Sequence, residues 1–419
     1  MAASLDGQAS SELRRLVPAA TRRANGAFFT ASHVRAQFAD AVREHGVEPY
    51  FDPACGAGDL LLTAATTLEA HDTTVGTMAM WSSQLRGRDI TNSFVSAARL
   101  RLQLAALARH GLCQTKLSQQ FFRGVSVGDG TRAMALATQP GTLLINPPFG
   151  RQHAPADCTW GSGSVPRAAI FLESALRNVA AGSKVVAILP DVLRSGSNSA
   201  RFRRVIDGLM AVEEVIPVGQ FDRWTDVDVF ILVGTRTQSG GHSIVETSTP
   251  VANTWLTKSP PGGSLRVGDF FEVRVGPVVQ TRDPRLGPER PFLMAHELPQ
   301  SGTVTKAAQR RPYAGRVFDP PFVVVRRTDR PSTHGRRAVA VTVDGDEATA
   351  VENHLLVLRP FDGSARTCRE LASWLSGPEV RSYLDSRINC RHLTTAALSE
   401  APLPAHWVKP DAYSELVTT

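Results

Sequence analysis

Cysteine, lysine and long apolar runs are all scarce in this sequence of 419 residues. The chain has five cysteines and no Cys-x-x-Cys pair, which argues against a zinc site. No uninterrupted apolar stretch approaches the roughly 20 residues that a membrane-spanning helix needs. Residues 1–26 contain arginines but no compact hydrophobic core, so we expect no targeting segment there. Scattered thiols without a signal peptide favour a reducing cytoplasm, and we expect neither a metal nor a membrane partner.

The composition is that of a globular protein with more than one domain. An apolar content of 42% is enough to bury a large core, and the length favours two domains. Between Gln238 and Gly263 the chain turns to serine, threonine, glycine and proline, as linkers between domains do. We therefore predict a first domain over residues 1–240 and a second over residues 264–419.

The most informative segment is Asn146-Pro147-Pro148-Phe149, which directly follows the apolar run Gly141–Ile145. The run is typical of a buried strand, and the prolines end it because neither can donate a ladder hydrogen bond. The asparagine thus lies at the carboxyl edge of a strand, where open α/β sheets place their ligand sites. Its amide oxygen and a neighbouring main-chain carbonyl could accept both hydrogens of an exocyclic amine, while the phenylalanine stacks on the heterocycle. A strand-terminating turn with the phenylalanine in the core is the alternative.

Three acidic residues occupy predicted strand ends before this motif. Asp52 ends a short apolar run and opens the small-residue turn Asp52–Gly58, which leads into a helix. Asp89 follows one βα unit later, where a ribose diol is usually held. Asp129 ends a third strand-like run and suits an adenine amino group. Each acid alone could be a solvated strand end, but three in succession indicate a ligand site.

The ordered set Gly26–Thr30, Asp52–Gly58, Asp89, Asp129 and Asn146–Phe149 resembles the S-adenosylmethionine-dependent N6-adenine DNA methyltransferases of the gamma arrangement. In that arrangement the cofactor motifs come first, the catalytic motif second and the target-recognition domain last. The resemblance covers roughly residues 20–235 motif by motif. It implies an α/β fold, with a Rossmann-like class I methyltransferase sheet that carries helices on both faces, followed by an α+β target-recognition domain.

The cofactor implied by this resemblance is S-adenosylmethionine. Asp52 would face its amino-acid portion, Asp89 would hold the ribose hydroxyls, and Asp129 would bind the adenine amino group. The Thr30 hydroxyl would lie near the methionine carboxylate. The full set of implied cofactor contacts is Phe28, Phe29, Thr30, Asp52, Ala54, Gly56, Gly58, Asp89, Ile90 and Asp129.

The catalytic residues implied by the resemblance are Asn146, Pro147, Pro148 and Phe149. The asparagine and the Pro147 carbonyl would orient the target amine, and Phe149 would stack on a base flipped out of the duplex. Phe221 would brace that base from its other side, although a place in the core is an equal alternative. No nucleophilic side chain is needed, because the sulfonium of the cofactor is already activated.

Past the catalytic motif the α/β pattern continues. The stretch Gly150–Pro166, rich in glycine and serine, is predicted to be a long loop beside the active site, with disorder as the alternative. The predicted elements that follow are a helix over Ile170–Val179, a strand over Lys184–Leu189, a turn at Pro190–Leu193, a helix over Asn198–Leu209 and a strand over Val229–Val233.

The second predicted domain carries the basic charge of the chain. Between Thr281 and Arg337 there are twelve Lys and Arg against five Asp and Glu, an excess equal to the formal net charge of +7. Such arginines could neutralise phosphates or read guanine edges, and a solvated arginine-rich surface is the alternative. The predicted DNA contacts are Arg282, Arg285, Arg326, Arg327 and Arg336.

The implied partner is double-stranded DNA, in a bacterial restriction-modification or phage-defence system. None of the five lysines has an acid two residues before it, which the usual nuclease core requires. We therefore expect any restriction nuclease to be a separate chain, and a separate specificity subunit is a second candidate partner. The remaining alternatives are cytosine N4 as the target, an enzyme acting on RNA bases or a protein glutamine, and a nucleic-acid-binding relative without turnover.

Overall fold

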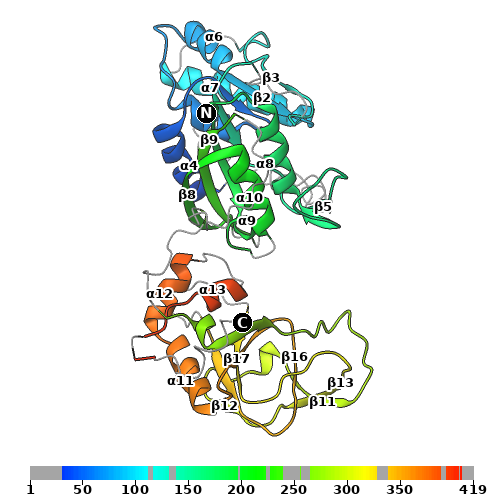
Figure 1. Ribbon diagram of the computed structural model, residues 1–419. Coiled ribbons are helices and arrows are strands. Elements are labelled where there is room, and N and C mark those ends of the chain that lie inside the picture. Colours follow the sequence, from blue (N-terminus) through cyan, green and yellow to red (C-terminus); the bar gives the residue numbers. More distant parts are fainter. Residues whose placement is uncertain are drawn as a thin grey trace. The chain divides into compact units, whose positions relative to one another are not determined.

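The computed structural model describes residues 31–111, 117–131, 138–196, 199–222, 227–238, 255, 265–327, 338–387, 393–404 and 406–407. The chain divides into two compact units, Met1–Trp255 and Leu256–Thr419, and each is described by itself (Figure 1). Four predicted site residues lie outside the described residues, namely Phe28, Phe29, Thr30 and Arg336.

The first unit is built on a seven-stranded sheet with the order β3-β2-β1-β4-β7-β9-β8. The five strands from β3 to β7 run parallel, and β9 is antiparallel to both of its neighbours. Chain order reverses beside β1, because β2 and β3 extend the sheet on one side and β4 and β7 on the other. The strands are β1 (Tyr50–Asp52), β2 (Leu85–Asp89), β3 (Val125–Val127), β4 (Thr142–Ile145), β7 (Lys184–Pro190), β8 (Met210–Gln220) and β9 (Asp228–Arg236).

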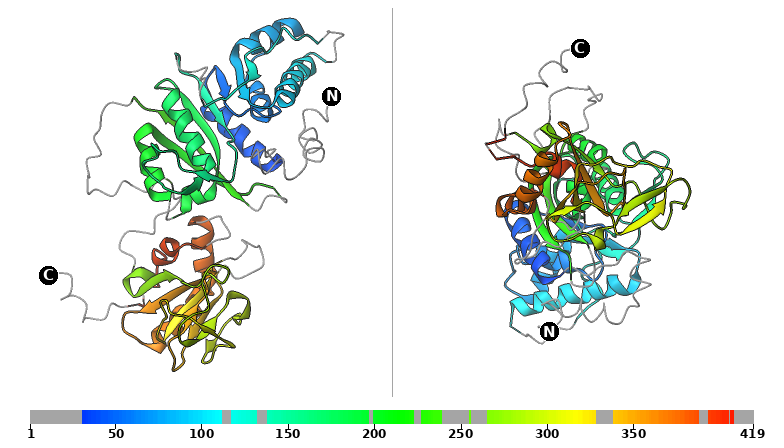
Figure 2. Two further views of the ribbon diagram at one scale, coloured as in Figure 1. Left: turned by 90° about the vertical axis from the view of Figure 1, so that its right-hand side faces the viewer. Right: turned by 90° about the horizontal axis from the view of Figure 1, so that it is seen from below.

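Helices cover both faces of this sheet, as Figure 2 shows. Contacts join α4 to β7 and β9, and α5 to β1, β2 and β4. The predicted α/β class with a mostly parallel sheet is therefore confirmed. The helices are α4 (Ser32–His45), α5 (Asp59–Ala65), α6 (Thr74–Gln84), α7 (Asn92–Arg109), α8 (Arg167–Asn178), α9 (Asp191–Ser195) and α10 (Ala200–Leu209).

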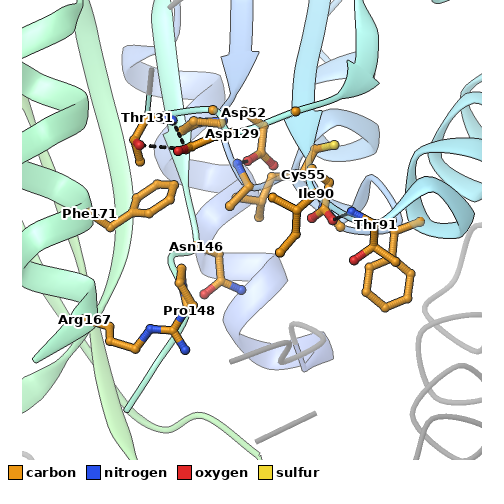
Figure 3. Close-up of a pocket in the computed structure, with 18 of the residues that line it drawn as sticks. Asp52, Cys55, Ile90, Thr91, Asp129, Thr131, Asn146, Pro148, Arg167 and Phe171 are labelled. Atoms are coloured by element: carbon orange, nitrogen blue, oxygen red, sulfur yellow. Dashed lines mark hydrogen bonds between the residues drawn. The ribbon is translucent and has the colours of Figure 1, made fainter. Parts of the chain in front are cut away.

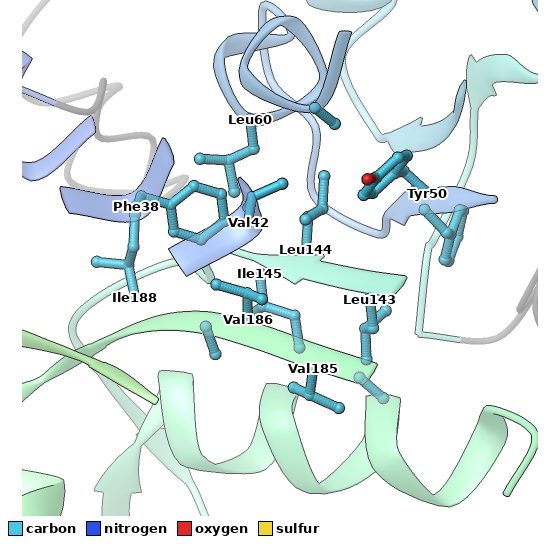
Figure 4. Packing of buried hydrophobic residues seen from close by; sticks show 14 of the residues in the cluster. Phe38, Val42, Tyr50, Leu60, Leu143, Leu144, Ile145, Val185, Val186 and Ile188 are labelled. Atoms are coloured by element: carbon cyan, nitrogen blue, oxygen red, sulfur yellow. The ribbon is translucent and has the colours of Figure 1, made fainter. Parts of the chain in front are cut away.

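The central strands are apolar on both faces, as a parallel sheet covered by helices requires. Phe38 and Val42 of α4 and Leu60 of α5 lie on one side of β4 and β7, together with Leu144 (Figure 4). Val185 points to the opposite face. All five side chains are buried, and burying a side chain of this size contributes about 1.5–3 kcal/mol. This packing fixes the strand ends that carry the polar residues of the site.

One predicted turn, Pro190–Leu193, is wrong, because the structure has the short helix α9 there. The buried Asp191 carboxylate accepts a hydrogen bond from Arg194 Nε at 2.6 Å and another from Ser195 Oγ at 2.8 Å. These bonds join residues three and four positions apart, so they close a helical turn directly after the strand. Sequence periodicity does not reveal a helix of five residues.

The stretch Gly150–Pro166 is not a structureless loop. Its ends form a two-stranded antiparallel hairpin of β5 (Arg151–His153) and β6 (Ser164–Pro166). Ala154 N–H extends the pairing by donating to Gly163 O at 2.7 Å. Arginine, glutamine and histidine in β5 carry little strand propensity, so long-range pairing rather than local preference forms this element.

In the residues that the structure describes, the second unit is an α+β unit of two further sheets and three α-helices. The larger sheet has the order β10-β17-β14-β15-β12, and the smaller has the order β13-β11-β16. Helix α11 packs on β14, β15 and β17, while α13 packs on β10. The elements are β10 (Phe271–Val275), β11 (Glu289–Leu293), β12 (Thr303–Val304), β13 (Gln309–Pro312), β14 (Phe322–Arg326), β15 (Ala340–Val343), β16 (Ala350–Val351), β17 (Leu355–Pro360), α11 (Ala365–Leu375), α12 (Pro378–Arg387) and α13 (Thr395–Ser399).

Candidate active site

A pocket of about 440 Å³ opens at the carboxyl edge of the sheet, where the chain order reverses. Asp52 ends β1 and Asp89 ends β2, while Asp129 and Asn146 follow β3 and β4. All four residues line this pocket, and Figure 3 labels Asp52, Asp129 and Asn146. Four positions far apart in the sequence thus meet because parallel strands bring their carboxyl ends to one edge.

The turn after β1 depends on glycine. Gly56 and Gly58 have φ angles of +50° and +87°, which side chains other than glycine rarely adopt. A Cβ at Gly58 would also lie 3.0 Å from the Cβ of Ala98 on α7, so the turn packs closely on that helix. Gly56 lines the pocket, whereas Gly58 lies behind it as the residue that precedes α5.

Arg101 of α7 holds this turn from behind, a role that the sequence did not suggest. Its Nη1 donates to Ala57 O at 2.7 Å, and its Nη2 pairs with the Asp59 carboxylate at 2.8 Å. Both side chains of the ion pair are buried. A buried ion pair of this kind is costly to break, because removing one partner leaves the other charge without compensation.

Asp52 is the most strongly perturbed acid of the site. Complete burial raises the pKa of its carboxyl to about 8, and the nearby Asp89 and Asp59 carboxylates add to the rise. A hydrogen bond from Ala54 N–H to Asp52 Oδ1, at 3.0 Å, opposes it. Without a cationic ligand this carboxyl is therefore mostly protonated at neutral pH.

Asp89 and Asp129 are held by main-chain donors. Asp89 Oδ2 accepts from Gly56 N–H at 3.0 Å and Asp89 Oδ1 accepts from Thr91 N–H at 2.8 Å. Asp129 Oδ1 accepts from the N–H of Thr131 at 3.0 Å and from its hydroxyl at 2.7 Å. These bonds fix the orientation of both carboxylates before any ligand arrives.

Apolar groups from two walls flank the pocket. Ile90, which follows β2, is 70% exposed, an unusual state for isoleucine. Phe171 of α8 comes from the other wall (Figure 3), and Ile170 and Ser174 of the same helix also line the pocket. Sequence reasoning missed Phe171 because an aromatic residue in a helical pattern usually belongs to the core. Phe171 also lies outside the sequence motifs of the site, so no neighbouring residue marks it as part of the pocket.

The catalytic motif divides between the pocket and the core. Asn146 and Pro148 line the pocket, together with Gln152 and Arg167, which sequence reasoning also missed. Pro147 and Phe149 are buried and do not contribute to the lining. The ring of Phe149 lies against Phe221, with centroids 5.2 Å apart.

Cys55 also lines the pocket, but its thiol is not set up for chemistry. Burial raises the pKa of the Cys55 thiol well above its usual value, and the carboxylates of Asp52 and Asp89 act in the same direction. Since the thiolate is the reactive form, a raised pKa makes this cysteine a poor nucleophile.

The predicted DNA-contact arginines of the second unit differ in their availability. Arg282 and Arg285 are exposed, and Arg282 pairs with Asp283 at 3.1 Å. Arg326 and Arg327 are half-buried and donate to main-chain carbonyls, those of Leu298 and Asn353 respectively. The neighbouring Arg311 is buried and is bonded to Asp283 O.

Within the described part of the chain, no three or more His, Cys, Asp or Glu side chains are grouped so that they could hold a metal ion. Among the same residues, no helix has both the length and the apolar character needed to cross a membrane.

The sequence model of the family described as N-6 DNA Methylase matches residues 13–239, more than half of the chain. This chain belongs to the N-6 DNA methylase family. The matched region contains the glycine turn, the three strand-end acids and the Asn146–Phe149 motif, so the resemblance inferred from these residues is confirmed. A search of curated proteins gave no match.

Several of the solved structures that are similar to this family member are of restriction-modification proteins. The type IIG restriction endonuclease BpuSI is 14% identical, with 94% of this chain and 61% of that chain covered and a TM-score of 0.42. The DrdV–DNA complex is 11% identical, with 94% of this chain and 57% of that chain covered and a TM-score of 0.47. The M protein of the type I restriction enzyme EcoKI is 15% identical, with 50% of this chain and 44% of that chain covered and a TM-score of 0.37. The chain thus spans less than two thirds of each of these chains.

Proposed function

We propose that this chain transfers a methyl group from S-adenosylmethionine to the N6 amine of an adenine that is flipped out of duplex DNA. The observation that carries the proposal is one pocket lined by Asp52, Gly56, Asp89 and Asp129 together with Asn146. The first four would hold the cofactor and the last would hold the amine. A single cavity would therefore bring donor and acceptor into contact.

The pocket fits the cofactor in charge and in shape. S-adenosylmethionine carries a sulfonium and an ammonium group against one carboxylate, and the acids at the glycine turn suit this net positive charge. Ile90 and Phe171 offer apolar surfaces on two walls for a planar adenine. Asp89 would accept from the ribose hydroxyls and Asp129 from the adenine amine. When bound, the cofactor supplies an activated methyl group.

The protein has to orient the target amine and exclude water. The side-chain oxygen of Asn146 and the main-chain oxygen of Pro147 would accept the two hydrogens of the amine, which turns its lone pair toward the methyl group. Rigid prolines hold both acceptors in place, so little reorganisation is needed in the transition state. Phe149 would stack on the base, and Phe221 would brace it.

The same proposal gives the second predicted domain, residues 264–419, the task of recognising DNA. Exposed Arg282 and Arg285 are the first candidates for phosphate contacts, and such contacts fix register while base contacts choose the sequence. Membership of the N-6 DNA methylase family supports modification in a bacterial restriction-modification or phage-defence system. A separate nuclease or specificity subunit would then be its partner.

The test is methyl transfer from labelled S-adenosylmethionine to unmethylated duplex DNA, to RNA and to protein, followed by digestion of labelled DNA to nucleosides. We expect label in N6-methyladenosine with the wild type and a loss of roughly 100-fold or more with Asn146→Ala. Gln84→Ala, which removes an amide at the end of α6 outside the pocket lining, is the matched control and should keep full activity.

Other outcomes point to the alternatives. Label in N4-methylcytidine would change the target base and leave the site assignment intact. Label in RNA or protein would keep the Asn146 chemistry and replace the substrate. Cofactor binding without transfer to any of the three would overturn the proposed activity of the isolated chain, and adding a candidate specificity subunit would then test a two-chain enzyme.

A further inference from the structure

The charged residues of the pocket are distributed unevenly. Four carboxylates line it, and among its described lining residues only Arg167 has a cationic side chain. In Figure 3, Arg167 lies on the side of Asn146 and Pro148, whereas Asp52 and Asp129 lie on the other side of the asparagine. A pocket with an acidic part and a guanidinium elsewhere suits a cation at one place and an anion at the other.

The backbone ties Arg167 to the catalytic motif. Its N–H donates to Gly150 O at 3.0 Å, so the first residue of α8 is bonded to the residue that follows Phe149. Strands β5 and β6 lie between these two residues and pair with each other along their whole length. The main chain of Arg167 is therefore placed by the fold and not by a free loop.

The hairpin itself is anchored to the body of the first unit. Trp160, in the segment between its strands, donates from Nε1 to Glu173 Oε2 at 2.6 Å. The indole ring also packs edge to face on Phe202, with centroids 5.2 Å apart. At the start of the hairpin, exposed Arg151 donates from Nε to Ser164 Oγ at 3.0 Å, which holds a second guanidinium in place.

We propose that Arg167 binds a phosphate of the nucleotide whose base enters the pocket, a role that rests on the proposed function. A flipped nucleotide stays attached to the strand through two phosphates, which remain at the mouth while the base goes inside. A guanidinium offers a planar fork of donors that matches phosphate oxygens. Arg167 thereby places the target base beside Asn146.

The methionine carboxylate of the cofactor is a second anion that would suit the same guanidinium. The phosphate is favoured because Arg167 lies on the side of the pocket that carries Asn146 and Pro148 (Figure 3), while the residues that suit the ammonium group of the cofactor lie at the glycine turn. The ammonium and carboxylate groups share one carbon, so they bind near each other. The experiment separates the two anions.

The experiment compares full-length wild type, Arg167→Gln and Arg167→Lys. Arg204→Gln is the matched control, since Arg204 of α10 is an exposed helical arginine in the same unit and does not line the pocket. The DNA probe is a duplex with the site that the wild type methylates, located by sequencing methylated DNA. A second duplex carries an uncharged methylphosphonate next to the target adenosine. KM and kcat are measured for each duplex, and the Kd of S-adenosylmethionine is measured without DNA.

We expect Arg167→Gln to raise the KM for the normal duplex roughly tenfold or more and to leave the Kd of the cofactor unchanged. The slope of log KM against log salt should fall by about one, as for the loss of one phosphate contact. The methylphosphonate should impair the wild type and have no further effect on Arg167→Gln. Arg167→Lys should fall between the wild type and Arg167→Gln, and Arg204→Gln should match the wild type.

Two results would overturn the phosphate contact. One is an equal response of wild type and Arg167→Gln to the methylphosphonate, and the other is a weaker Kd for the cofactor with an unchanged KM for DNA. Unchanged cofactor affinity also shows that the variant is folded. If the wild type itself methylates no DNA, the proposed function fails and the phosphate contact fails with it.

Discussion

The rings of Phe149 and Phe221 meet edge to face, with centroids 5.2 Å apart and an angle of 75° between their planes. Both side chains are buried, at 3% and 0% exposure. A base held between two aromatic rings touches one ring with each face, so rings that touch each other leave no place for it. Under the proposed function, entry of the base therefore requires the two rings to separate.

The first prediction concerns this aromatic pair. Phe149→Leu should reduce kcat/KM for DNA roughly 10- to 100-fold, because stacking on a base is worth about 1–3 kcal/mol and leucine has no aromatic face. Phe221→Leu should have a smaller effect of the same kind. The affinity for S-adenosylmethionine should not change. Kinetics with the duplex that the wild type methylates would measure the loss in kcat/KM. Fluorescence of 2-aminopurine at the target position would measure how far the base is flipped out.

The control for lost packing is Phe230→Leu. Phe230 is fully buried in the same unit, and its ring packs on Trp255. Its replacement should lower the melting temperature about as much as Phe149→Leu without changing the fluorescence of the flipped base. A similar kinetic loss in all three variants would mean that the pair acts only as core.

The second prediction concerns the stability of the ligand-free protein. Because the folded pKa of Asp52 is about 8, against 3.8 ordinarily, the folded protein keeps a proton that the unfolded chain releases between these values. The free energy of unfolding should therefore fall as pH rises from about 4 to 8, by at most about 1.4 kcal/mol per unit. Asp52→Asn should remove this trend and melt at a higher temperature than wild type at pH 9. Thermal unfolding between pH 5 and 9 checks it.

The third prediction concerns cofactor affinity at the same residue. A cation bound near Asp52 favours the carboxylate, so the Kd of S-adenosylmethionine should tighten as pH rises toward 8, by up to about tenfold per unit. Above pH 8 it should level off. Calorimetry with Asp52→Asn should show weaker binding of S-adenosylmethionine and no dependence of its Kd on pH over this range. A slope that persists in Asp52→Asn would assign the titration to another group.

The fourth prediction concerns the turn that Arg101 holds. Arg101→Met leaves the buried Asp59 carboxylate without its partner and Ala57 O without a donor, so it should destabilise the protein by about 3–5 kcal/mol. The double variant with Asp59→Leu should recover a large part of that loss, because no lone charge remains buried. Urea unfolding of both single variants and the double variant gives the coupling. Additive losses would show that the ion pair does not matter.

The strand-end residues of the site could be predicted because each carries a local signal. Acids or an Asn-Pro-Pro turn directly after an apolar run show where a strand ends, and parallel topology then brings Asp52, Asp89, Asp129 and Asn146 together. The connecting helices were also predictable, since their apolar faces repeat with the helical period.

The remaining parts of the site depend on tertiary structure. Arg167 and Phe171 look like ordinary helix residues, and only the packing of α8 beside the sheet brings them to the pocket. Arg101 lies 44 residues from the Ala57 carbonyl that it holds, a distance that no sequence window spans. The contact of Phe149 with Phe221 likewise joins segments that follow β4 and β8, two strands that are not neighbours in the sheet, so their local sequences do not reveal it.

The last prediction concerns the anchor of the hairpin. Trp160→Phe keeps an aromatic ring against Phe202 but removes the hydrogen bond to Glu173, so it should loosen the β5–β6 hairpin at a small cost in stability, about 1 kcal/mol. Trp255→Phe is the matched control, because it loses the same type of bond, to Asp207 at 2.7 Å. Hydrogen exchange of peptides covering residues 150–166 should accelerate in the first variant only. Equal protection in both variants would mean that strand pairing alone holds Arg167 in place, and the hairpin would then need no anchor.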